Sequence, residues 1–337
     1  HVPGCMSLLI RACIVSFERA KSSVPASRSR QWAKRSKKSS TPLSRCYSSS
    51  SYQSPIILKE QGSSKLANVG RVKPDGTTGR FFKKTSVVQV NNGWEVEVDG
   101  YCITSKEGKR IVFPSEELAV ATAADWEYMH KRVDPRRMPL YTMASLATDL
   151  TDYTRKMHRE TIKLVFEDDI LGPRNEKPTE HLQQLWKTFH DPVINWFRQE
   201  YDIGFTVDNT MTTKQPRRSS RVMMRGVDAL DDWALIGLVT NVDTTLSLVL
   251  SLSLWNGRAT VEEAAAASRA EYVIQEASWG DVPGNTDIRR LNYLMDLHAS
   301  TFFLHSLPSP VFNGAWLQSL PAVAPKPESQ TKMHIGF

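Results

Sequence analysis

The chain has 337 residues, of which 40% are hydrophobic and 23% charged, a balance typical of a globular protein and unlike that of a disordered one. The net charge of +7 is unevenly placed, because residues 1–58 hold ten basic residues and one acidic residue, a net +9, which leaves −2 for residues 59–337. A mildly acidic body has no broad attraction for phosphate, so we predict no nucleic-acid partner. Cys102 is the single cysteine after residue 58, so this body has no internal disulfide, as is usual in a reducing compartment.

Residues 1–58 are rich in Arg, Lys and Ser. Counted from Met6, the apolar residues Ile10, Ile14 and Phe17 share one helical face, and arginines lie off that face. Positive charge combined with an amphipathic face is typical of a mitochondrial transit peptide, which we predict here; a disordered basic tail is the alternative.

Short β-strands are predicted after a Gly- and Ser-rich linker at 59–78. Apolar and polar residues alternate over 86–90 and 94–98, with a turn between them, which predicts a hairpin. Further short apolar segments at 101–104 and 110–113 complete a predicted antiparallel sheet of four strands.

A helix is predicted next. Ser115 can cap it, and Glu116 and Glu117 occupy its first turn, where acidic side chains suit the helix dipole. We expect this helix to cover one face of the sheet. A Pro-rich break then separates a β-rich domain at 79–135 from an almost wholly helical domain at 136–307, so the predicted fold class is α+β.

Within the helical domain, residues 209–225 are polar and basic and are predicted to be mobile. The stretch Leu235–Trp255 is predicted as one long buried helix, although it is near the length of a membrane span, which makes a membrane-associated protein one alternative. Thr260 and Glu263 form a capping box for a second, Ala-rich helix. Residues 308–337 are Pro-rich and are predicted to form a flexible tail.

The sequence contains no P-loop, dinucleotide-binding, zinc-protease or nucleophile-elbow motif. We therefore predict no catalytic residue, no metal and no cofactor. A second alternative is an enzyme with a dispersed acid/base site that uses His158, Glu160 and Asp168. Glu271 lies on the Ala-rich helix, where either a surface role or a contact with a partner fits the residues alone.

Several blocks, in order, resemble the mitochondrial ATP synthase assembly-factor family that chaperones the alpha subunit of the catalytic sector. The resemblance covers about residues 79–307 and is specific in the order and spacing of its blocks. They are RFFKKTSVVQVNNGWEVEVDG (80–100), VFPSEELAVATAADWE (112–127), MPLYTMASLATDLTD (138–152), DPVINWF (191–197) and SLVLSLSLWNGRATVEEAAAASRAE (247–271), which runs into Trp279-Gly280.

The resemblance implies a β-rich domain followed by a helical domain, no catalysis and no cofactor. It also implies a protein of the mitochondrial matrix that holds the unassembled alpha subunit until the beta subunit replaces it. We expect the protein to be a monomer. An acidic position that matters in the family falls on Glu271. The residues predicted to contact the partner are Glu271, Trp279, Trp233 and Asp287. The chain departs from the family pattern at Leu246, Tyr272, Val273 and Thr286.

Overall fold

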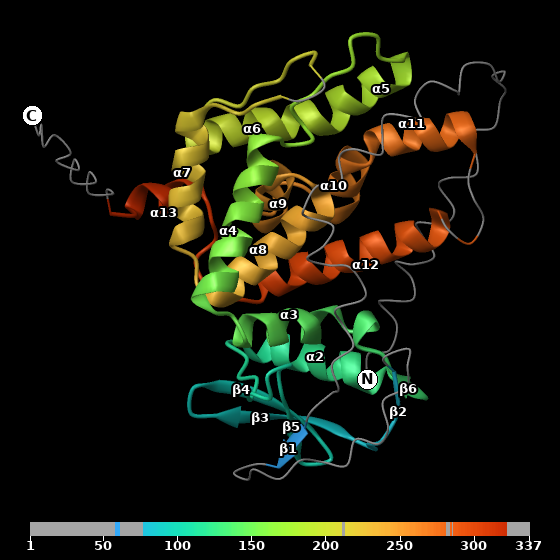
Figure 1. The fold of residues 1–337 in the computed structure, drawn as a ribbon, viewed down its shortest axis with the longest axis vertical. Helices are drawn as coiled ribbons and strands as arrows, with labels where there is room; N and C mark the ends of the chain where they lie inside the picture. Colours follow the sequence, from blue (N-terminus) through green and yellow to red (C-terminus); the bar gives the residue numbers. More distant parts are fainter. Residues whose placement is uncertain (1–57, 61–76, 211–212, 281–283, 285, 322–337) are drawn as a thin grey trace, which may run out of the picture. The chain divides into compact units, whose positions relative to one another are not determined.

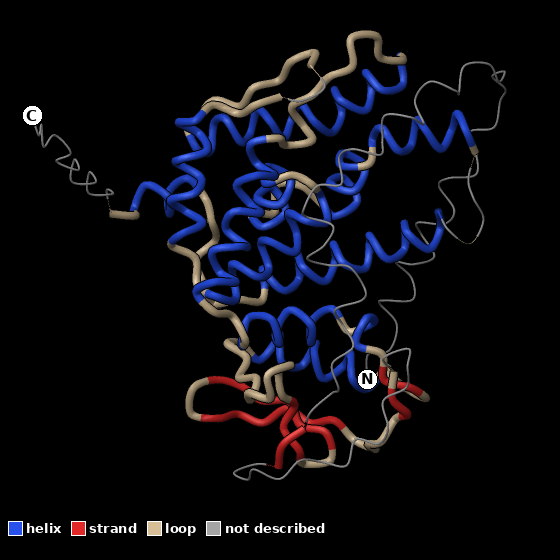
Figure 2. The backbone as a smooth tube through the Cα atoms, viewed as in Figure 1, coloured by secondary structure: helices blue, strands red, loops and turns tan. Residues whose placement is uncertain are grey.

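The structure is a computed structural model that describes residues 58–60, 77–210, 213–280, 284 and 286–321. These residues belong to one compact unit, residues 45–337. The predicted transit peptide lies outside the described residues except for Leu58, and so does most of the predicted linker. Strands are confined to the first part of the described chain and helices make up most of the rest, which confirms the predicted α+β class (Figures 1 and 2).

The main sheet has four antiparallel strands in the order β1-β5-β4-β3. The predicted hairpin is confirmed: β3 (Thr85–Val90) pairs with β4 (Gly93–Val98), with Val90 opposite Gly93. Next to β4 lies β5 (Tyr101–Ile103).

The fourth strand differs from the prediction. Residues 110–113 make only isolated bridges, such as Trp94 with Phe113, and the edge is instead formed by β1 (Leu58–Glu60) paired with β5. Part of the predicted linker is therefore a strand. Its pairing depends on a segment about 40 residues away, which local alternation does not reveal.

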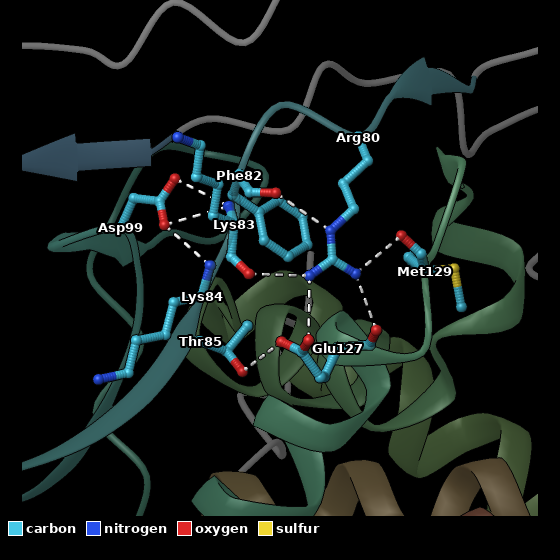
Figure 3. A network of polar contacts seen from close by, with 8 residues as sticks. All are labelled: Arg80, Phe82, Lys83, Lys84, Thr85, Asp99, Glu127 and Met129. Carbon is cyan, nitrogen blue, oxygen red and sulfur yellow. Dashed lines mark hydrogen bonds and ion pairs between the residues drawn. The ribbon is translucent and has the colours of Figure 1, made fainter.

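A second, two-stranded sheet pairs β2 (Thr78–Gly79) with β6 (Arg132–Val133). Between the two sheets, the guanidinium of Arg80 donates to the carbonyls of Glu127 at 2.9 Å and Met129 at 3.3 Å and pairs with the Glu127 carboxylate at 3.1 Å (Figure 3). The same carboxylate accepts a hydrogen bond from the Thr85 hydroxyl at 3.1 Å. Arg80 lies in the first block of the family resemblance, and its role here is to join the start of the β-rich part to the end of α2.

The predicted covering helix is α2 (Glu116–Glu127), and Ser115 caps it as expected by accepting from the amide of Leu118. It packs against β3 and β4. The ring of Trp126 is fully buried between Phe82 at 5.8 Å and Tyr141 at 5.3 Å, in edge-to-face contacts that join the sheet, α2 and the next helix.

The helical part begins with η2 (Pro135–Arg137), α3 (Pro139–Thr148) and α4 (Asp152–Glu167). It continues with α5 (Glu180–Leu185), the π-helical turn η3 (Trp186–His190) and α6 (Asp191–Tyr201). Helix α3 packs against both α2 and α8, so the packing is continuous where we expected a domain boundary, and that boundary stays a prediction.

The segment predicted to be mobile contains an ordered helix, α7 (Arg217–Asp228), whose Met223, Met224 and Val227 are buried. The predicted long helix is two helices, α8 (Asp232–Thr245) and α9 (Leu248–Trp255), separated by Leu246 in a left-handed conformation with φ of 55°. Helix α8 lies at the centre of the helical part and packs against α3, α4 and α12.

The Ala-rich helix is also divided, into α10 (Val261–Ser268) and α11 (Ala270–Trp279), although its capping box between Thr260 and Glu263 is confirmed. The chain continues with α12 (Thr286–His305) and α13 (Gly314–Ser319).

Residues 308–321 are held against the helical part, unlike the flexible tail that we predicted. Phe312 is fully buried, and its carbonyl accepts a hydrogen bond from the hydroxyl of Tyr201. A side chain at Gly314 would collide with the carbonyl of Glu200, because an added Cβ would lie 1.9 Å from that oxygen. The rest of the predicted tail, 322–337, lies outside the described residues.

Candidate functional site

Arg269 stands at the turn between α10 and α11 and joins three helices. Its guanidinium pairs with the carboxylate of Glu276 at 3.0 Å and lies 5.9 Å and 5.6 Å from the ring centroids of Tyr272 and Tyr293. The Tyr293 hydroxyl, on α12, is hydrogen-bonded to the hydroxyl of Ser268, on α10. This arrangement fixes the start of α11 relative to α12, so residues nearby are presented in a defined geometry.

Glu271 lies in the first turn of α11 and is exposed. Within the described ranges its carboxylate has no hydrogen-bond or ion-pair partner, because the nearby Arg269 is already paired with Glu276. An exposed carboxylate without a partner in its own protein stays hydrated and can pair with a cationic group on another protein.

Two other predicted contact residues lie beyond Glu271 along the chain. Helix α11 ends at Trp279, whose side chain is outside the described part of the structure, and Gly280 stops the helix with φ of 81°. Asp287 is exposed in the first turn of α12. With a rise of 1.5 Å per residue, Glu271 and Trp279 are about 12 Å apart along α11, at its two ends.

Trp233 lies elsewhere, half buried in an aromatic stack. Its ring is stacked on Phe303 of α12 at 5.7 Å with an interplanar angle of 15°, and it contacts Phe113 of the β-rich part at 5.8 Å. Phe303 is about 24 Å along α12 from Asp287. The structure therefore does not bring the four predicted contact residues together, and it gives Trp233 an internal packing role.

Sequence reasoning missed an apolar surface on α12. Ile288, Leu291 and Phe302 are 53%, 63% and 42% exposed, and with the half-buried Met295 they repeat at spacings of three, four and seven residues. At 100° per residue these four side chains fall within an arc of about 60°, so they form one stripe about 21 Å long. We call these four residues the α12 stripe.

A signal for this stripe exists in the sequence. Helix α12 also buries Leu297, Phe303 and Leu304 on another face, so it is apolar on more sides than its own neighbours can cover. A large exposed apolar surface on a folded protein marks a binding site more often than chance. The stripe and the carboxylate of Asp287, which is about 40° around α12 from Leu291, together make a surface suited to binding a protein, with apolar contacts and a charged edge. Glu271 lies next to Arg269, whose contact with Tyr293 is on another side of α12.

The residues of the enzyme alternative do not converge. His158 and Glu160 are two residues apart on α4 and therefore point about 160° away from each other, and Asp168 caps the far end of the same helix, about 15 Å from His158. Glu160 is paired with Lys163 at 3.0 Å. Nothing in this arrangement places an acid and a base around one reacting atom.

A surface depression of about 390 Å³ lies between α5, η3 and the loops at 174–178 and 207–209. Its Arg174 is paired with Asp191 at 2.7 Å and lies 4.7 Å above the ring of Trp186. Nearby His190 is buried and held by the carbonyl of Ala267 at 2.8 Å, and burial lowers the pKa of its imidazole to about 4. Among the described residues no group of three His, Cys, Asp or Glu side chains is arranged to hold a metal.

Asp169, just after the end of α4, has a structural role. Asp169 is fully buried and accepts hydrogen bonds from the hydroxyl of Ser247 and the amides of Leu248 and Val249, which lie at the start of α9.

In the part of the chain that the structure describes, no helix is both long and apolar enough to cross a membrane.

Comparison with solved structures and protein families finds chaperones that share this fold. A chaperone candidate from Agrobacterium tumefaciens has the same fold, with a TM-score of 0.63 and 26% identity over 68% of this chain and 87% of that one. Atp12 from Paracoccus denitrificans shares the fold with a TM-score of 0.60 and 24% identity, over 67% of this chain and 97% of that one, and so does an Asp-to-Lys variant of it. Residues 79–198 match the family described as ATP12 chaperone protein.

The match over residues 79–198 and the shared fold indicate a protein of the chaperone class. Those residues match the ATP12 chaperone family, a family of ATP synthase assembly factors, which confirms the resemblance seen in the sequence blocks that lie within them.

Proposed function

We propose that this protein binds the unassembled alpha subunit of the F-type ATP synthase in the mitochondrial matrix. It acts as a monomer, without catalysis, and shields the subunit interface of alpha until the beta subunit replaces it. An alpha subunit that lacks its neighbours exposes apolar surface that is prone to aggregate, and a chaperone must cover that surface reversibly.

The observation that carries this proposal is the α12 stripe, with three large side chains more than 40% exposed on an ordered helix. An apolar stripe can cover an apolar patch on the client, while Asp287 at its edge adds charge recognition. Charged groups at an interface edge mainly set specificity and association rate, and the apolar centre supplies most of the affinity.

Replacing Ile288 and Leu291 together by glutamate is expected to weaken capture of the alpha subunit about tenfold to hundredfold, because two apolar contacts are replaced by charges that must lose water. Both side chains are exposed, so the free energy of unfolding should change by no more than about 0.5 kcal/mol for each. Capture is measured by co-purification with a tagged alpha subunit, and stability by urea unfolding.

The control is Val120→Glu on α2, which replaces one exposed apolar side chain, 51% exposed, by a single negative charge and should leave capture unchanged. A second apolar stripe exists on α4, formed by Tyr153, Met157 and Leu164. Full capture by the α12 double variant, combined with loss of capture in Leu164→Glu, would contradict the assignment and move the binding surface to α4.

Glu271→Lys is expected to weaken capture while leaving the fold intact, because this carboxylate is exposed and makes no internal ion pair among the described residues. We expect about a tenfold loss, most of it in the association rate and reduced at high salt. Glu180→Lys is a matched control, since Glu180 also lies exposed in the first turn of a helix. Equal capture by Glu271→Lys and the parent protein would remove Glu271 from the binding surface.

A further inference from the structure

Positive charge is concentrated on α7 and on the residues just before it. From residue 209 to residue 227 the sequence has five basic residues and no acidic residue, a net +5, within a body of residues 59–337 whose net charge is −2. The remainder of that body is therefore −7. The five residues are Lys214, Arg217, Arg218, Arg221 and Arg225.

Most of these basic side chains are exposed to solvent. Arg217, Arg218 and Arg221 are exposed and fall within an arc of about 100°, while Met223 and Val227 are buried on the other side of α7. We call these three arginines the α7 cationic face. They make no ion pair within the described ranges, and Asp228, the acid at the end of α7, is already paired with Arg159.

Nothing in the local shape of this face suits an inserted peptide. The α7 cationic face is the outer side of a helix that packs on α4, and none of its residues lines the depression near Arg174. It also contains no large exposed apolar side chain, whereas protein interfaces depend on apolar and aromatic anchors at their centre. Exposed arginines without apolar anchors suit a diffusely anionic surface.

The neighbouring helix adds an aromatic side chain. Arg225 donates a hydrogen bond to the carbonyl of Leu317 at 2.8 Å, which ties α13 to the neighbouring α7 (Figure 1). Trp316, the residue before Leu317, is half exposed, and its ring contacts the buried Phe312 at 5.1 Å. Basic residues next to a tryptophan are typical of segments that bind the headgroup region of a bilayer.

We propose that the α7 cationic face, with α13 beside it, attaches this protein to the surface of an anionic phospholipid bilayer. The attachment is peripheral and electrostatic, so it is weakened by salt. It is separate from the α12 stripe, and a chaperone held at a membrane in this way keeps its client-binding helix free.

The test uses the full chain and vesicles of phosphatidylcholine with or without about 30 mol% phosphatidylglycerol. Arginine-selective modification, read by mass spectrometry, reports each site, which matters because residues 1–58 are themselves basic. We expect anionic vesicles to slow modification of Arg217, Arg218 and Arg221 several-fold while leaving the exposed Arg258 unchanged. Salt at about 0.5 M should abolish the protection.

Flotation of the same vesicles with variants is the second measurement. Changing all three arginines to glutamine should weaken binding by about a hundredfold, at roughly tenfold per 1.4 kcal/mol and about 1 kcal/mol per basic residue. The control changes Lys106, Lys156 and Lys177, which are exposed on other elements, to glutamine, so its net charge is equal. Equal binding by both variants and the parent, with no protection on α7, would overturn the proposal. Protection by soluble alpha subunit and not by vesicles would also overturn it and assign the face to a protein.

Discussion

Trp233→Ala is expected to lower the free energy of unfolding by about 3 kcal/mol. Loss of a large aromatic side chain from a packed site costs about 3–5 kcal/mol, and Trp233 is half buried, so the lower end of that range applies. The ring lies between Phe113 of the β-rich part and Phe303 of α12. Its removal therefore weakens the contact between the two parts of the fold, and urea unfolding measures the loss.

The conservative variant Trp233→Phe keeps an aromatic ring in the stack and should cost about 1 kcal/mol. Both variants should capture the alpha subunit normally at temperatures where they remain folded. An unchanged free energy of unfolding in Trp233→Ala, accompanied by lost capture, would contradict the internal role and return Trp233 to the partner surface.

The second large effect is expected at Asp169, whose replacement by alanine should cost about 3–5 kcal/mol. The carboxylate accepts from the Leu171 amide at 3.1 Å, the Ser247 hydroxyl at 3.0 Å and the amides of Leu248 at 3.0 Å and Val249 at 3.4 Å. Each buried donor left without a partner costs about 1–3 kcal/mol. The affected donors sit where α9 begins, so thermal and urea unfolding should both report the loss.

Because of the buried Asp169 carboxyl, we also expect the free energy of unfolding to depend on pH. Burial raises the pKa of its carboxyl from 3.8 to about 7, although the four hydrogen bonds favour the charged form and limit the rise. Between these values the folded protein binds more protons than the unfolded chain, so the carboxyl contributes stability at low pH that is lost as the pH rises through about 7.

Asp169→Asn removes this titration. The difference in unfolding free energy between the parent and Asp169→Asn should therefore shrink as the pH rises from about 5 to about 8, by roughly 2–4 kcal/mol. A difference that stays constant over this range would contradict the raised pKa.

Local signals in the sequence were sufficient to predict several helices and strands. The hairpin of β3 and β4, the cap at Ser115 and the capping box at Thr260 are all confirmed. Each depends on residues within a few positions of one another, so the pattern that forms the element is contained in a short window.

The errors arise where a distant residue decides the outcome. Helix α8 ends at Leu246, and Ser247 caps the next helix by accepting from the amide of Leu250. Asp169, 78 residues earlier, accepts from the Ser247 hydroxyl and the Leu248 amide, a contact that the apolar stretch from Leu235 to Trp255 does not reveal. The buried position of Phe312 likewise depends on Tyr201, more than 100 residues away. A Pro-rich composition alone gave no sign of that contact.

The predicted contact residues stay predictions. The exposed, unpaired state of Glu271 fits the role that the family resemblance implies, and Trp233 was chosen as a contact although its ring is used in internal packing. The α12 stripe was missed because Ile288 and Leu291 have the same helical spacing as buried residues. Which apolar face of a helix remains uncovered depends on the placement of all its neighbours.

The most direct test of the account is co-expression of this chain with the ATP synthase alpha subunit and, separately, with the beta subunit. The amount of soluble subunit and its co-purification with the chain are measured. We predict soluble alpha subunit in an equimolar complex that the Ile288→Glu/Leu291→Glu variant fails to form, and no effect on beta. Insoluble alpha subunit beside a folded chain, or capture of beta in place of alpha, would contradict the proposed function.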